Sequence, residues 1–92
     1  MQESASSTRS ESPVSISMAS RITGVEVHTL RYWEKEFPGY LRPKRTSGGQ
    51  RRYSPEDIRT VFTLKRLLRD EMFSIAGAKR HLVKIHEVSR AA

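Results

Sequence analysis

Glycine and proline divide the middle of this chain into short segments, and this punctuation limits what the chain can fold into. Gly24 follows one short apolar-patterned stretch, Pro38 and Gly39 end the next, and Gly48-Gly49 interrupts a third. Glycine readily adopts the positive φ of tight turns, and proline stops a helix. The region before residue 54 therefore has room only for short helices and a tight hairpin.

Two short helices joined by a three-residue turn are predicted before Pro38. The first covers about residues 17–23, with Ser15 or Ser17 as its N-cap. Its apolar side is formed by Ile16, Ala19 and Ile22. Residues 23–25 form the turn, and the second helix covers residues 26–36. This order is the helix-turn-helix pattern.

Residues 40–53 are predicted to form a hairpin that projects as a small wing. Residues 40–43 and 51–53 flank the turn sequence Thr46-Ser47-Gly48-Gly49. Pro43 restricts the first strand to the edge of a sheet, because proline cannot donate a ladder hydrogen bond.

Two further helices follow the hairpin. Ser54-Pro55-Glu56-Asp57 is a helix start, and the helix is expected to reach about Arg69. Its apolar face is formed by Ile58, Val61, Phe62, Leu64, Leu67 and Leu68. Residues 70–73 break the pattern, and Ser74 caps a last helix over 74–83.

The predicted fold class is mainly α, a winged helix-turn-helix of four helices plus a small β-hairpin wing over residues 14–83. Residues 1–13 are rich in serine and poor in apolar groups, so we expect a disordered tail. Residues 84–92 are expected to be the frayed start of a linker or of a dimerisation helix.

Charge favours a polyanionic partner. The formal net charge is +7, and residues 14–53 alone hold eight basic and three acidic side chains. No cysteine is present, His81 and His86 lack the spacing of a shared metal site, and no catalytic or cofactor motif occurs. We therefore expect no enzyme, no metal and no cofactor. No apolar run could cross a membrane and no signal peptide is recognised, which favours the cytoplasm.

The helix over 26–36 has the chemistry of a helix that reads DNA. Leu30, Trp33 and Phe37 can face the core, which leaves polar side chains outside. These are His28, Thr29, Arg31, Tyr32 and Lys35. Arg31 suits a guanine or a phosphate, and Thr29 suits a phosphate or a thymine methyl. Glu34 is expected to form an orienting ion pair, with a wing arginine as the candidate partner, rather than to read a base. The alternative is that Tyr32 and Trp33 simply complete a small core.

The predicted wing carries four cations around a tip of small residues, namely Lys44, Arg45, Arg51 and Arg52. A thin basic ribbon can lie against a sugar-phosphate backbone. A solvated basic loop is the alternative interpretation.

From Ile16 to Leu82 the sequence resembles the DNA-binding domain of the MerR family of bacterial transcription regulators. The resemblance rests on Thr23-Gly24-Val25, Thr29 to Glu34, Leu41 to Arg45, Gly49 to Ser54, Leu67-Leu68 and Phe73-Ser74-Ile75. It implies a winged helix-turn-helix with 26–36 as the recognition helix, a phosphate contact at Arg51, and backbone contacts by Arg31 and Tyr32. Glu26 departs from a Ser-like cap, Met18 from a commonly acidic residue and Met72 from a glycine.

The resemblance also implies partners. They are a double-stranded inverted-repeat operator or promoter and, for a longer parent protein, a homodimer; alone, this chain is expected to be a monomer or weak dimer. An isolated domain of a longer regulator is favoured over a naturally short protein. Two other hypotheses stay open: an excisionase-like architectural DNA-binding protein, and a basic module that binds an acidic protein.

Overall fold

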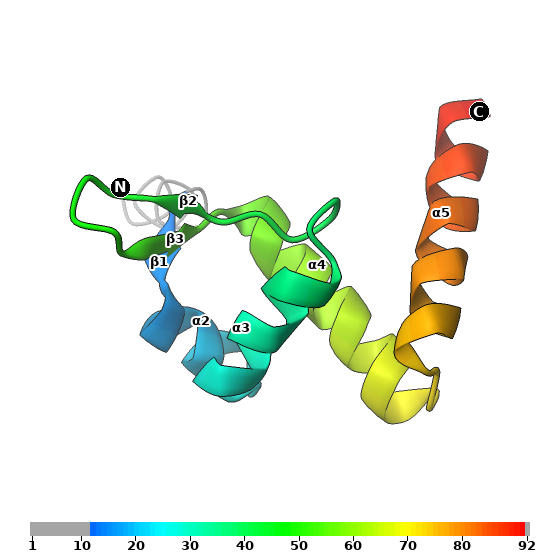
Figure 1. The fold of residues 1–92 in the computed structure, drawn as a ribbon, viewed down its shortest axis with the longest axis horizontal. Helices are drawn as coiled ribbons and strands as arrows, with labels where there is room; N and C mark the ends of the chain where they lie inside the picture. The colour runs from blue at the N-terminus through cyan, green and yellow to red at the C-terminus, as the bar shows by residue number, and fades with distance from the viewer. Residues whose placement is uncertain (1–11, 92) are drawn as a thin grey trace, which may run out of the picture. The chain divides into compact units, whose positions relative to one another are not determined.

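The computed structural model describes residues 12–91, which form helices and one small sheet (Figure 1). The elements in chain order are β1 (Val14–Ser15), α2 (Ile16–Thr23), α3 (Val27–Glu36), β2 (Lys44–Arg45), β3 (Arg51–Tyr53), α4 (Pro55–Lys65), the π-helical turn η1 (Arg66–Asp70) and α5 (Ile75–Ala91). The chain divides into two compact units, Met1–Phe62 and Thr63–Ala92. The predicted mainly-α winged helix-turn-helix is confirmed. Apart from Ser12 and Pro13, the predicted tail lies outside the described residues.

Helix α2 has well-formed caps at both ends. Ser15 is its N-cap, and the Ser15 hydroxyl accepts a hydrogen bond from the Met18 amide at 3.1 Å. Gly24 ends the helix with φ at 76°, and its amide donates to the Ser20 carbonyl at 2.8 Å. The left-handed conformation explains why glycine stands in the predicted turn.

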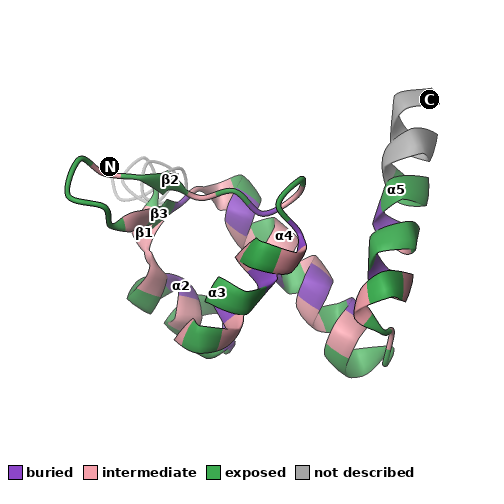
Figure 2. Cartoon of the chain, in the orientation of Figure 1, coloured by how far each residue is buried: buried purple, intermediate pink, exposed green. Residues whose placement is uncertain are grey.

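The prediction of the buried side of α2 is wrong at Ile22. Ala19 and Thr23 are buried, whereas Ile22 is 46% exposed. Buried and exposed residues both occur along α2 (Figure 2). The helix packs against α3 and β3, and the Ala19–Thr23 spacing of four residues is the one that faces them. Thr23 is tolerated there because its hydroxyl donates to the Ala19 carbonyl at 2.8 Å.

Helix α3 buries the side that the sequence predicts. Leu30, Trp33 and Phe37 are each at most 4% exposed. Glu26 is the N-cap residue but makes no side-chain capping bond. Its carboxylate instead accepts a hydrogen bond from the Thr29 hydroxyl at 3.3 Å.

The sheet has three strands in the order β1-β3-β2, all antiparallel. The strand predicted over residues 40–43 is wrong. A turn over residues 38–40 follows α3 instead, and residues 41–43 have no regular secondary structure. The amides of Tyr40 and Leu41 donate to the Phe37 carbonyl, and Leu41 is buried. The third strand, β1, was not predicted, because two residues that pair with a distant segment leave no local pattern.

The wing turn is a three-residue loop closed by two backbone hydrogen bonds. The Gly49 amide donates to the Thr46 carbonyl, and the Thr46 amide donates to the Gln50 carbonyl, both at 2.8 Å. Gly49 has φ at 86°, as expected for the left-handed residue that completes a type I turn in such a loop. The predicted glycine turn is therefore confirmed, with Gly49 as the residue that needs to be glycine.

The predicted start of α4 is confirmed. The Asp57 amide donates to the Ser54 hydroxyl at 3.1 Å, and the Ser54 amide donates to the Asp57 carboxylate at 3.0 Å. This reciprocal pair satisfies two backbone donors at the helix start. The continuous helix to Arg69 is wrong, because regular α-helix ends at Lys65 and η1 follows.

The structure after residue 54 differs from the prediction at Phe62 and at the end of the last helix. Val61, Leu64 and Leu67 are buried as predicted, but Phe62 is exposed. Helix α5 continues to Ala91, past the predicted end at residue 83. A role for residues 84–92 as a linker or dimerisation helix stays a prediction.

Candidate nucleic-acid interface

The outer side of α3 presents the polar residues that the sequence singles out. Four of them are exposed, namely His28, Arg31, Tyr32 and Lys35. Tyr32 is 49% exposed and so does not belong to the core, whereas Trp33 does. Thr29 is half-buried, and its hydroxyl is engaged with Glu26. The helix therefore combines an anchored apolar side with an accessible side of cations and hydroxyls.

The wing places its four cations on two different faces. Arg45 lies opposite Arg51 in the register, and Lys44 lies opposite Arg52. Successive strand residues point to opposite faces of a sheet, so these are two separate pairs. We call the Arg45–Arg51 side the inner wing face and the Lys44–Arg52 side the outer wing face.

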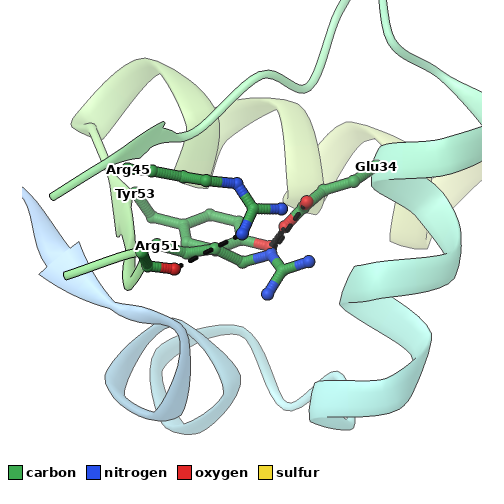
Figure 3. Close-up of polar contacts among 5 residues, drawn as sticks. Glu34, Arg45, Arg51 and Tyr53 are labelled. Atoms are coloured by element: carbon green, nitrogen blue, oxygen red, sulfur yellow. Dashed lines mark hydrogen bonds and ion pairs between the residues drawn. The ribbon is translucent and has the colours of Figure 1, made fainter. Parts of the chain in front are cut away.

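The Glu34 carboxylate joins α3 to the inner wing face (Figure 3). The Arg51 Nε lies 2.7 Å from one carboxylate oxygen of Glu34 and 2.9 Å from the other. The Tyr53 hydroxyl donates to the same carboxylate at 2.7 Å. This confirms the predicted ion pair of Glu34 with a wing arginine.

The junction is largely shielded from solvent. The side chains of Arg51 and Glu34 are 19% and 14% exposed, and Tyr53 is fully buried. Burial, followed by the hydrogen bond to Glu34, raises the pKa of the Tyr53 hydroxyl well above its usual range. The hydroxyl therefore stays protonated and donates its hydrogen bond at any physiological pH.

The terminal nitrogens of Arg51 point away from Glu34 (Figure 3). The carboxylate thus holds the guanidinium by its Nε and leaves the other end available. Arg45 is also oriented, because its Nη1 donates to the Gly49 carbonyl at 3.3 Å. Both arginines of the inner wing face are therefore positioned before any partner binds.

A cleft of about 280 Å³ brings α3 and the inner wing face together. Its walls are Ser15, Ile16, Ser17, Arg31, Gln50 and Arg51. Arg31 from α3 and Arg51 from β3 thus line one hollow beside the start of α2. Two guanidinium groups on one concave surface favour an anion, and phosphate accepts their forked donors well.

The sequence did not identify Gln50, Ser15 or Ser17 as lining residues, or Tyr53 as a partner of Glu34. The available signal for Tyr53 was its position two residues after Arg51 on a strand, which places both on one face. Ser15 and Ser17 carried no such signal, because β1 brings them to the wing through non-local pairing.

The described part of the chain shows neither a metal site nor a membrane-spanning helix. Among the side chains that the structure describes, in residues 12–85, no group of three or more His, Asp or Glu could hold a metal ion. Within the same residues, no helix is both long and apolar enough to cross a membrane. His81 instead packs its ring on Phe73, with ring centroids 5.1 Å apart.

Comparison with known proteins gives a consistent result. A family model described as "MerR HTH family regulatory protein" matches residues 14–85. The HTH-type transcriptional repressor CarH of Myxococcus xanthus is 38% identical over 72 residues, which make up 78% of this chain and 23% of that protein. The putative heat shock protein HspR of Streptomyces coelicolor is 38% identical over 65 residues, 71% of this chain and 42% of that protein.

A further relative is the HTH-type transcriptional repressor CarA of Myxococcus xanthus. It is 39% identical over 59 residues, which make up 63% of this chain and 20% of that protein. The chain thus spans less than half the length of these relatives.

Proposed function

The chain belongs to the MerR family of helix-turn-helix regulatory proteins, and from this membership we propose that it binds double-stranded DNA within a transcription regulator. Helix α3 enters the major groove, and the inner wing face rests on the sugar-phosphate backbone. The observation that carries this proposal is the Glu34 junction, which fixes Arg51 beside the exposed side of α3.

Each exposed side chain of α3 has a role in this arrangement. Arg31 donates to a guanine edge or a phosphate, and the Tyr32 hydroxyl donates to a phosphate. Lys35 contributes charge at longer range, while His28 and Thr29 lie at the start of the helix, close to the base edges. Glu26 holds the Thr29 hydroxyl, so Thr29 presents its methyl group more readily than its oxygen.

The wing contributes more to the affinity for DNA than to the recognition of its base sequence. Glu34 takes the Nε of Arg51 and leaves its terminal nitrogens for a phosphate. A guanidinium that is already oriented loses less conformational freedom on binding, which favours the complex. Arg45 adds a second cation on the same face. Lys44 and Arg52 lie on the outer wing face and form no part of this proposed contact.

Two copies of the domain are proposed to act together in a longer homodimeric protein that reads an inverted repeat in the cytoplasm. The two recognition helices would then meet half-sites about one helical turn apart. One copy alone should bind weakly, because it neutralises few phosphates. The excisionase-like alternative shares the winged fold, and family membership favours the regulator.

An NMR titration of the isotope-labelled chain with a mixed-sequence duplex of about 20 base pairs, two helical turns, tests the contact surface. We expect the largest amide shifts at Arg31, Tyr32, Gln50 and Arg51. Shifts that avoid α3 and the inner wing face would show that the proposed contact is wrong.

The Arg31→Ala variant controls for indirect shifts. It should bind the same duplex more weakly, by about three- to tenfold, and should still shift the wing amides when enough DNA is added. Unchanged affinity of this variant would count against the placement of α3.

A further inference from the structure

The outer wing face carries a like-charge pair that the fold itself does not neutralise. Lys44 and Arg52 lie directly opposite each other, and neither side chain makes a hydrogen bond or ion pair in the described part of the chain. Like charges placed opposite on a sheet are destabilising. On the inner wing face, by contrast, Glu34 neutralises Arg51. The outer pair is therefore a costly arrangement unless an anion binds there.

The outer pair borders a hollow of about 580 Å³, which we call the outer wing hollow. Its lining residues are Pro13, Gly39, Tyr40, Arg42, Lys44, Arg52, Ser54, Glu56 and Asp57. Arg42 is a third exposed cation without an ion pair within residues 12–91. None of the α3 residues proposed to read DNA lines this hollow.

The hollow also contains two acids, and these decide what kind of anion fits. Asp57 is committed to the start of α4, where its carboxylate accepts from the Ser54 amide and hydroxyl. Glu56 is exposed and makes no ion pair in the part of the chain that the structure describes. A duplex backbone is a continuous row of phosphates and would be repelled by Glu56. A polypeptide can place carboxylates beside the cations and a backbone amide or cation beside Glu56.

We propose that the outer wing hollow is a docking surface for an extended acidic segment of a partner protein. Carboxylates of the segment pair with Arg42, Lys44 and Arg52. Because this surface is opposite the inner wing face, the partner and the duplex use different cations. The regulator can then hold DNA and an acidic protein segment at the same time.

The proposal is tested with a fluorescein-labelled, end-capped peptide of alternating glutamate and glycine. The peptide has about six residues, which span roughly 20 Å in extended form. Binding to the 92-residue chain is followed by fluorescence anisotropy. In Arg42→Ala we expect affinity for the peptide to fall about three- to tenfold, with affinity for the mixed-sequence duplex unchanged. Glu56→Gln should bind the peptide more tightly.

Arg31→Ala is the matched control, because it removes the same charge from the proposed DNA face. It should weaken duplex binding and leave peptide binding unchanged. Equal loss of peptide affinity in Arg31→Ala and Arg42→Ala would overturn the proposal, since the peptide would then respond to net charge or to the DNA face. The proposal would also be overturned if Arg42→Ala lost affinity for the duplex, or if the wild-type chain did not measurably bind the peptide. Thermal melts followed by circular dichroism confirm that the variants fold.

Discussion

The carboxylate of Glu34 accepts hydrogen bonds from Arg51 and Tyr53, and so links α3 to β3 across 17 and 19 residues of sequence. All three side chains are mostly or fully buried. Removal of one partner would leave the others short of a hydrogen bond, which typically costs about 1–3 kcal/mol. At the residue scale, this junction gives the wing a fixed position beside α3.

Tyr53→Phe tests the junction through the pH dependence of stability. The pKa of Tyr53 is raised in the folded protein above its ordinary value of 10.0, whereas in the unfolded chain it stays near that value. The stabilisation is therefore complete below pH 10 and is lost as the pH rises above it, by up to about 1.4 kcal/mol per pH unit. Tyr53→Phe should cost about 1 kcal/mol at neutral pH, and this cost should shrink above pH 10.

Urea unfolding of the wild type and of Tyr53→Phe, from neutral pH to about pH 11, measures this effect. The range spans the ordinary tyrosine pKa of 10.0. A cost that stays constant across the range would show that the Tyr53 hydroxyl does not keep its proton in the folded state.

The sequence identified one half of this junction. Glu34 was predicted to form an ion pair with a wing arginine, and the structure identifies that arginine as Arg51. Tyr53 as the second donor depends on the register of β3, which local sequence does not encode. At position 72 the resemblance was informative where the residue itself was not. The resemblance gives a glycine there, and Met72 adopts a φ of 61°, in the left-handed region that favours glycine.

At the element scale, residues with strong local signals were predicted well. Helices begin or end as expected at Gly24, at Pro38 and at Ser54–Asp57, because caps and helix breakers act through the nearby backbone. Strand β1 was missed, because it is fixed by pairing with the distant strand β3. Residues 40–43 were wrongly predicted as a strand, because the amides of Tyr40 and Leu41 donate back to the Phe37 carbonyl at the end of α3. The π-helical turn η1 was also missed, since the apolar spacing of Leu64 and Leu67 is compatible with a continuous α-helix.

Gly49→Ala tests the wing turn. A Cβ at Gly49 would meet no atom within 4 Å, so any cost comes from its φ of 86°. We expect a loss of about 1 kcal/mol in the free energy of unfolding, measured by urea denaturation. Gly48→Ala is the matched control: its Cβ meets only the Thr46 hydroxyl at 3.8 Å, and its φ is not positive. Equal costs at both positions would contradict the assignment of Gly49 as the left-handed residue.

At the scale of the whole molecule, the net charge and the family membership favour the same kind of partner, a polyanion. A net charge of +7 favours polyanions in general, and the family match over residues 14–85 is the reason why we propose DNA among them. Within the first unit, the cations separate into an inner set beside α3 and an outer set around the outer wing hollow. Composition could not show this division, because it depends on which strand residues lie opposite each other.

The central claim is that Arg51 contacts a DNA phosphate from the inner wing face. The most direct measurement is the salt dependence of binding to a mixed-sequence duplex, compared between Arg51→Ala and Arg52→Ala. The two variants lose the same charge at adjacent positions on opposite faces. A second comparison in the Glu34→Gln background removes the carboxylate that Arg51→Ala would leave unpaired.

We predict that Arg51→Ala lowers the slope of log affinity against log salt by about 0.9, the value for one phosphate contact, and that Arg52→Ala leaves the slope unchanged. An unchanged slope in Arg51→Ala, in both backgrounds, would contradict the proposed contact of the wing with DNA.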